Sequence, residues 1–223
     1  MDLVESLRDF WCRHQNDSNR QRAIQRYCCE QLCQRDLHGV LPERAIVGRY
    51  RVKNWDAALV VGGEPRLAIS CKSIISNHSG TVPNRIDDML GEAVSLHRNY
   101  PRAVLGHLCM ISRCDKSLKK EAADATGQVE PERLAGLHAK ADEWFDKYAT
   151  GVAVAGDRSG CDDLDEKFEV ACCYQVDFEV DPYAIVVHPS SLGLEEFFDR
   201  LVDVFRQRFG DLAESAPPTT LFR

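Results

Sequence analysis

Three short apolar segments separated by turn-forming residues constrain the fold of this chain more than any other feature. Residues 45–52 and 56–61 have the composition of β-strands, and residues 67–72 form a third such segment. Residues 62–65, Gly-Gly-Glu-Pro, join the last two, and paired glycines favour the tight turn of a β-hairpin. We therefore expect an antiparallel meander of three strands.

Periodic apolar residues elsewhere predict alternating helices and strands. Helices are expected over residues 3–14, from an N-cap at Asp17 or Ser18 to Leu37, from Pro83 to about residue 99, over 132–148 and over 192–209. Further strands are expected over residues 104–111, 168–178 and 183–187, with a polar loop over 76–82 and an irregular charged segment over 113–131. This order predicts an α/β fold.

Composition indicates one folded domain without a membrane partner. The chain has 223 residues, of which 44% are hydrophobic, and residues 57–63 are its longest uncharged apolar run. The N-terminus has no basic region before an apolar stretch, so we expect a cytoplasmic protein. We expect a single domain over 1–212, divided into N-terminal helices (1–38), a core (44–112), an insertion of helix and loop (113–166), strands with a C-terminal helix (167–210), and a flexible tail (213–223).

The net charge of −7 conceals an uneven distribution. Residues 44–120 contain 13 basic and 6 acidic side chains, whereas residues 121–223 contain 9 basic and 22 acidic side chains. A locally basic region can bind a polyanion whatever the total charge, although an acidic segment that balances the basic one in the fold would give the same counts.

Ten cysteines are present, but none forms a CxxC pair. Structural zinc sites usually contain such pairs, so we expect reduced, buried thiols rather than a zinc site.

Asp56 and Lys72 are the first candidates for chemistry. Asp56 opens the second expected strand and Lys72 ends the third, so a hairpin brings them together. A carboxylate can bind Mg²⁺, which activates a water and polarises a phosphoryl oxygen, while an ammonium group orients the nucleophile. This pair suits phosphodiester hydrolysis.

Three motifs around this pair carry a family resemblance. They are residues 53–56 (Lys-Asn-Trp-Asp), 67–73 (Leu-Ala-Ile-Ser-Cys-Lys-Ser) and 84–93 (Asn-Arg-Ile-Asp-Asp-Met-Leu-Gly-Glu-Ala). In order and spacing they resemble the PD-(D/E)xK nuclease superfamily, and more narrowly type II restriction endonucleases related to the Xho-type enzymes. The motifs are short, and the resemblance covers about a quarter of the chain.

The resemblance implies a restriction-endonuclease-like fold, a central mixed β-sheet flanked by helices. It implies one or two Mg²⁺ ions per active site, and cleavage of double-stranded DNA at a specific sequence to leave a 5′-phosphate and a 3′-hydroxyl. Cutting a palindromic site implies a homodimer, because the two-fold symmetry of the DNA matches that of the protein. A companion DNA methyltransferase is also implied.

The sequence departs from the superfamily pattern at Ser70, which replaces the acid of the acid-x-Lys motif. Some restriction enzymes with Ser-x-Lys take the missing acid from the next helix, where this chain has Asp87, Asp88 and Glu92. Asp88 and Glu92 are four residues apart and share a helix face. We favour Asp88 as the metal ligand, with Glu92 second, although a solvated face with an Arg–Asp pair would show the same spacing. Ser70 itself is expected to be an inert inward side chain.

The candidate site therefore has catalytic, metal and DNA-contacting residues. Catalysis is assigned to Asp56, Lys72, Asp88 and Glu92, and metal binding to Asp56, Asp88 and the backbone carbonyl of Cys71. The residues expected to contact DNA are Arg49, Arg51 and Lys53, which alternate along the first strand, with Asn84, Arg85, Lys116, Lys119 and Lys120.

A serine at position 70 is also compatible with two alternatives. The chain can be a degenerate nuclease fold that binds nucleic acid without cutting it, as a subunit of a defence or repair complex. Alternatively, Ser70 is an engineered replacement of an acid, in which case Ser70→Glu would restore activity.

Overall fold

In a computed structural model of the chain, residues 2–13, 17 and 19–210 are described. Within this range, strands β1 to β6 form one mixed sheet in sequential order. The strands are β1 (Leu41–Val47), β2 (Val52–Val61), β3 (Glu64–Ile74), β4 (Val104–Ser112), β5 (Val170–Asp177) and β6 (Ala184–Val187). The first three pair antiparallel, β3, β4 and β5 pair parallel, and β6 returns antiparallel at the far edge.

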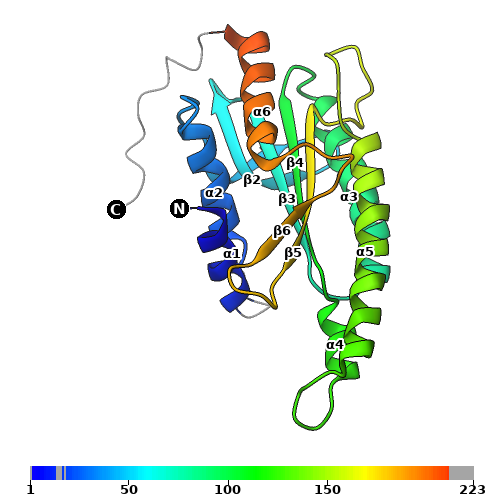
Figure 1. The fold of residues 1–223 in the computed structure, drawn as a ribbon. Helices are drawn as coiled ribbons and strands as arrows, with labels where there is room; N and C mark the ends of the chain where they lie inside the picture. Colours follow the sequence, from blue (N-terminus) through cyan, green and yellow to red (C-terminus); the bar gives the residue numbers. More distant parts are fainter. Residues whose placement is uncertain (1, 14–16, 18, 211–223) are drawn as a thin grey trace.

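Helices cover both faces of this sheet (Figure 1). They are α1 (Leu3–Cys12), α2 (Arg22–Cys33), α3 (His78–His97), α4 (Lys116–Ala122), α5 (Pro131–Val154) and α6 (Leu194–Phe209). Helices α1, α2 and α6 enclose one buried cluster against the sheet, and α3 and α5 enclose the other. The expected α/β sheet flanked by helices is confirmed. Among the described residues, none of the helices is long and apolar enough to cross a membrane.

The predicted antiparallel meander is confirmed, and its second turn is formed by the paired glycines. Gly62 and Gly63 have φ angles of 60° and 84°, in the left-handed region that glycine adopts without steric cost. Strands β2 and β3 therefore reverse direction over two residues.

The prediction for the first strand is wrong. Residues 45–52 are expected to form one strand, but β1 ends at Val47 and β2 begins at Val52, with a turn between them. Gly48 donates its N–H to the carbonyl of Arg51 at 2.9 Å, which closes this turn. Arg49, Arg51 and Lys53 therefore do not alternate along one strand, because the first two lie in the turn.

The start of α3 also differs from the prediction. The helix begins at His78, five residues before the expected first residue, Pro83. The carboxylate of Asp115 accepts the backbone N–H groups of Asn77 (3.0 Å) and His78 (2.8 Å), which the preceding turn leaves unpaired. A side chain distant in sequence therefore sets where this helix begins.

The segment 113–131, expected to be irregular, contains α4. Asp115 again supplies the reason, because its Oδ1 accepts the backbone N–H of Ser117 at 3.0 Å and caps this helix. One carboxylate thus orders the N-termini of two helices beyond the parallel strands.

The second helix starts later than expected. It begins at Arg22, whereas Asp17 or Ser18 is the expected N-cap. The Asp17 carboxylate accepts the N–H of Asn19 at 2.8 Å, in the turn before the helix. Ser18 and the tail over 213–223 lie outside the described residues.

Candidate active site

The candidate site lies where strands β2 and β3 separate. Their pairing ends at Ala57 and Ile69, although β2 starts five residues before Ala57 and β3 continues five residues beyond Ile69. In this opening the Oδ2 atom of Asp56 accepts the backbone N–H of Cys71 at 2.7 Å. The side chain of Asp56 thus replaces a missing strand-to-strand hydrogen bond and is fixed between the strands.

A glutamine from helix α2 forms a second hydrogen bond to the carboxylate of Asp56. Gln25 of α2 donates from Nε2 to Asp56 Oδ1 at 3.0 Å. Burial raises the pKa of Asp56, and the hydrogen bonds from Gln25 and Cys71 and the nearby ammonium groups of Lys53 and Lys72 oppose that shift. Each carboxylate oxygen accepts one of these hydrogen bonds, so acceptor capacity is left for a further ligand.

Glu92 of α3 is the central residue of a cluster of hydrogen-bonded charged side chains at this opening. Its carboxylate is 3% exposed and lies 2.5 Å from Lys53 Nζ and 2.7 Å from Lys72 Nζ. Its Oε2 also accepts the hydroxyl hydrogen of Ser70 at 2.8 Å. Burial alone would raise the pKa of Glu92, but the two ammonium groups outweigh it and lower the pKa to about 2. The carboxylate is therefore ionised throughout the physiological pH range.

Lys53 belongs to this cluster. Its ammonium group donates to Ser70 Oγ at 3.0 Å and lies 3.9 Å from the centre of the Trp55 ring. Burial lowers the pKa of Lys53 to about 8, with Glu92 opposing the shift. The sequence predicts that Lys53 contacts DNA from one face of a strand. In the structure, its side chain is only 15% exposed and faces Glu92.

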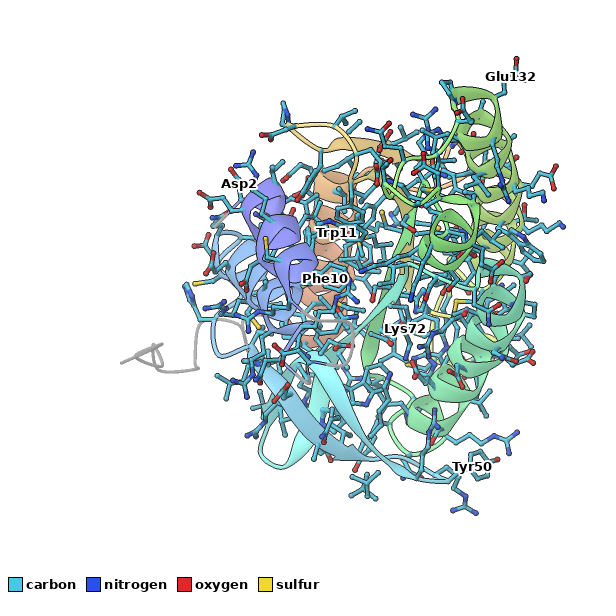
Figure 2. All side chains as sticks on the ribbon, turned by 90° about the horizontal axis from the view of Figure 1, so that it is seen from below. Asp2, Phe10, Trp11, Tyr50, Lys72 and Glu132 are labelled. Atoms are coloured by element: carbon cyan, nitrogen blue, oxygen red, sulfur yellow. The ribbon has the colours of Figure 1, made fainter. Side chains whose placement is uncertain are left out.

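The structure brings Asp56, Lys72 and Glu92 to the same opening of the sheet. Lys72 is 13% exposed, and Figure 2 shows it toward the middle of the molecule. Asp88 lies one helical turn before Glu92, and its half-exposed carboxylate pairs with Arg85 Nη1 at 3.0 Å. Asp88 thus forms the surface Arg–Asp pair, whereas Glu92 faces the two lysines.

Sequence reasoning missed two members of the site. Ser70 is buried, as expected for an inward side chain, but it is not inert, because it forms hydrogen bonds with both Lys53 and Glu92. Gln25 has no sequence signal beyond a place on an amphipathic helix, and only the packing of α2 on the sheet brings it to Asp56. The alternation of β3 could have indicated Ser70, since Ser70 and Lys72 share one face of that strand.

The expected DNA-contacting residues lie on the β1–β2 turn, β2, α3 and α4. Arg51 lies 3.8 Å from Glu92, and Arg49 is exposed in the same turn. Asn84 is exposed on α3 and donates to the carbonyl of Gly80 at 2.9 Å.

Three lysines lie beyond the end of β3. Lys116, Lys119 and Lys120 line a cavity of about 620 Å³ together with Ser76. Lys119 also pairs with Glu179. Arg49 and Arg51 thus lie in the β1–β2 turn, whereas the three lysines lie on α4.

The oxygen atoms of the site suit a hard cation. Asp56 and Glu92 supply carboxylates, the ligands that Mg²⁺ prefers, and Mg²⁺ is commonly held by one or two carboxylates with water and substrate phosphate completing its shell. Among the described residues, no group of three or more His, Cys, Asp or Glu side chains is placed to hold a metal. Two carboxylates alone are fewer protein ligands than a structural metal usually has.

Comparison of the chain with protein-family models, curated proteins and solved structures found no match. The geometry of the site is therefore the basis for a functional assignment.

Proposed function

We propose that the chain is a Mg²⁺-dependent endonuclease of the type II restriction kind, which hydrolyses phosphodiester bonds at a specific sequence of double-stranded DNA. The observation that carries this proposal is the convergence of Asp56, Lys72 and Glu92 where β2 and β3 separate. Two carboxylates and an ammonium group at one opening are the groups that this hydrolysis requires.

The order of elements supports the same proposal. A helix, three antiparallel strands, a helix and a parallel strand follow one another from α2 to β4. We propose that this is the restriction-endonuclease-like core that the sequence motifs imply. The homodimer, the cytoplasmic location and the companion methyltransferase are proposals that rest on the same resemblance.

Asp56 and Glu92 would hold the metal, with the carbonyl of Cys71 as a third oxygen ligand. When bound, Mg²⁺ lowers the pKa of a coordinated water and polarises a phosphoryl oxygen. We assign the helix carboxylate to Glu92 rather than Asp88, because Glu92 contacts Lys72 whereas Asp88 contacts Arg85.

Other side chains at the site would then position the attacking water and the phosphate. Lys72 uses one of its three N–H donors on Glu92, which leaves donors for a water or a phosphate oxygen. Gln25 and the Cys71 N–H hold the Asp56 carboxylate in one orientation. Lys53 balances the charge of Glu92, so a phosphate entering the opening meets two ammonium groups beside the carboxylates.

A non-cutting DNA-binding protein is the second candidate, and one observation favours it. The Glu92 carboxylate is already bound by Lys53, Lys72 and Ser70, and a metal would have to displace part of this shell. The two candidates differ in whether a phosphodiester bond is broken.

Cleavage of supercoiled plasmids that together contain many short sequences tests the proposal. With Mg²⁺ or Mn²⁺ the native chain should cut at discrete positions, and chelation by EDTA should stop it. Asp56→Asn and Lys72→Met should each reduce the rate by at least about 100-fold. Glu143→Gln, which changes an exposed carboxylate on α5, is the matched control and should cut at the native rate.

Binding without cutting, on every substrate and with either metal, would reject the nuclease and leave the second candidate. Cutting that survives Asp56→Asn would place the chemistry elsewhere.

A further inference from the structure

The turn between β1 and β2 combines positive charge with exposed apolar side chains. Residues 44–53 contain three arginines and one lysine and no acidic residue. Tyr50 in the turn is 64% exposed, and Val47 and Val52 on either side of it are 59% and 61% exposed. Figure 2 shows Tyr50 at the rim of the molecule. Such a patch on a soluble chain indicates a binding surface.

This turn is held firmly by α3. The N–H of Arg49 donates to the carbonyl of Ser95 at 2.6 Å, and the N–H of Tyr50 donates to Ser95 Oγ at 3.3 Å. A Cβ added to Gly48 would lie only 2.9 Å from the Ser95 carbonyl oxygen, so the backbones approach as closely as glycine permits. The Tyr50 hydroxyl also accepts a hydrogen bond from Arg98 at 2.9 Å. The exposed tip is therefore attached to α3 by several hydrogen bonds.

The same helix connects the turn to the candidate active site. Ser95 lies less than one helical turn after Glu92, and Arg51 Nη2 lies 3.8 Å from Glu92 Oε1. Whatever binds to the tip of the turn therefore lies beside the Asp56–Lys72–Glu92 opening at a fixed distance.

We infer that the β1–β2 turn enters a groove of duplex DNA, where Arg49 binds the backbone and Tyr50 contacts the bases beside the cleaved phosphate. This inference rests on the proposed function and adds a contact surface to it. The major groove of DNA is wide enough to admit a two-stranded β-ribbon, and side chains at the tip of such a ribbon can reach base edges. Tyrosine contributes an apolar ring that can pack on base edges and on the thymine methyl group in the major groove.

Charge favours DNA over a second copy of the chain. In a two-fold symmetric contact the same surface lies opposite itself, so the arginines of one turn would face those of the other. Arg49 and Arg44 are both exposed, and no acidic residue lies between them or elsewhere in residues 44–53. A polyanion neutralises this charge, whereas self-association concentrates it.

Duplex binding, measured with Ca²⁺ in place of Mg²⁺, tests whether Arg49 contacts the DNA backbone. The probe is a plasmid-derived duplex that the native chain binds, and the dissociation constant is measured over a series of salt concentrations. Loss of one phosphate contact should reduce the slope of log K against log salt by about 0.9. We expect this reduction for Arg49→Gln and not for Arg200→Gln, which removes the same charge from the exposed face of α6. Equal slopes for the two variants would overturn the inference.

Substitution of Tyr50 gives an independent test of the proposed contact with the bases. Tyr50→Ala should weaken binding by about tenfold without changing the salt slope, because a neutral ring that contacts base edges releases no counterions. Tyr50→Phe should retain most of the affinity, and Val186→Ala, at an exposed site on β6, should retain all of it. Tyr50→Ala with native affinity would overturn the inference.

The assays also separate this inference from the proposed function. A chain that binds through the turn but never cuts would reject the nuclease and support the turn as a DNA contact. A chain that cuts while Arg49→Gln and Tyr50→Ala bind normally would reject only the turn. If sedimentation shows that these substitutions dissociate a dimer while duplex affinity per protomer is unchanged, the surface is a self-association site and the inference is wrong.

Discussion

Replacement of Glu92 by glutamine should destabilise the fold by an amount that depends on pH. The native carboxylate is buried between Lys53 and Lys72, and its pKa falls from 4.5 to about 2. A shift of this size corresponds to about 3 kcal/mol of stability at pH 7. Because the folded pKa lies below the unfolded one, the contribution is complete above the unfolded pKa and is lost as pH falls toward the folded one. At pH 3 roughly 1 kcal/mol should be left.

Urea unfolding followed by circular dichroism at pH 7 and pH 3 measures this effect. Asp88→Asn is the matched control on the same helix, because its exposed pair with Arg85 should contribute no more than about 0.5 kcal/mol at either pH. A destabilisation by Glu92→Gln that equals that of the control, or that stays constant between the two pH values, would refute the assigned charge cluster.

Three further substitutions test the packing that positions the site, each by its urea unfolding midpoint. Gly63→Ala should cost about 1 kcal/mol because residue 63 has a φ of 84°, and an unchanged midpoint would contradict the assigned turn. Gly106→Ala should cost about 1–3 kcal/mol because its Cβ would lie 2.9 Å from Leu201 Cδ1, and a stabilised variant would show that the interface has room. Glu169→Gln should cost about 3 kcal/mol because Arg158 would lose its buried carboxylate, and a loss below about 1 kcal/mol would exclude that ion pair.

The sequence predicts the centre of the fold well, because local signals determine it. Gly62 and Gly63 demand a tight turn, and the apolar segments on both sides have the composition of strands, so the β2–β3 hairpin follows from neighbouring residues. The same register, with Ala57 opposite Ile69, places Asp56 beside residues 70–72, so the proximity of Asp56 and Lys72 follows from the hairpin.

Features set by distant residues could not be predicted. The start of α3 depends on the carboxylate of Asp115, which lies 37 residues after His78. The turn that follows β1 is held against α3 by the hydrogen bond from the N–H of Arg49 to the carbonyl of Ser95, which is distant in sequence.

Within the site, the choice between the two acidic residues of α3 could not be predicted from the sequence either. Spacing places Asp88 and Glu92 on one helix face but does not decide which one the sheet covers. The rotation of α3 on the sheet directs Glu92 toward Ser70 and Lys72 and leaves Asp88 beside Arg85.

The most direct test of the central claim is the single-turnover rate of DNA cleavage with Mg²⁺ for the native chain, Glu92→Gln and Asp88→Asn. Circular dichroism of each variant verifies that it is folded at the assay temperature. The Asp56–Lys72–Glu92 site predicts that Glu92→Gln loses at least about 100-fold in rate whereas Asp88→Asn stays near the native rate. A native rate for folded Glu92→Gln, or loss of activity only in Asp88→Asn, would contradict it.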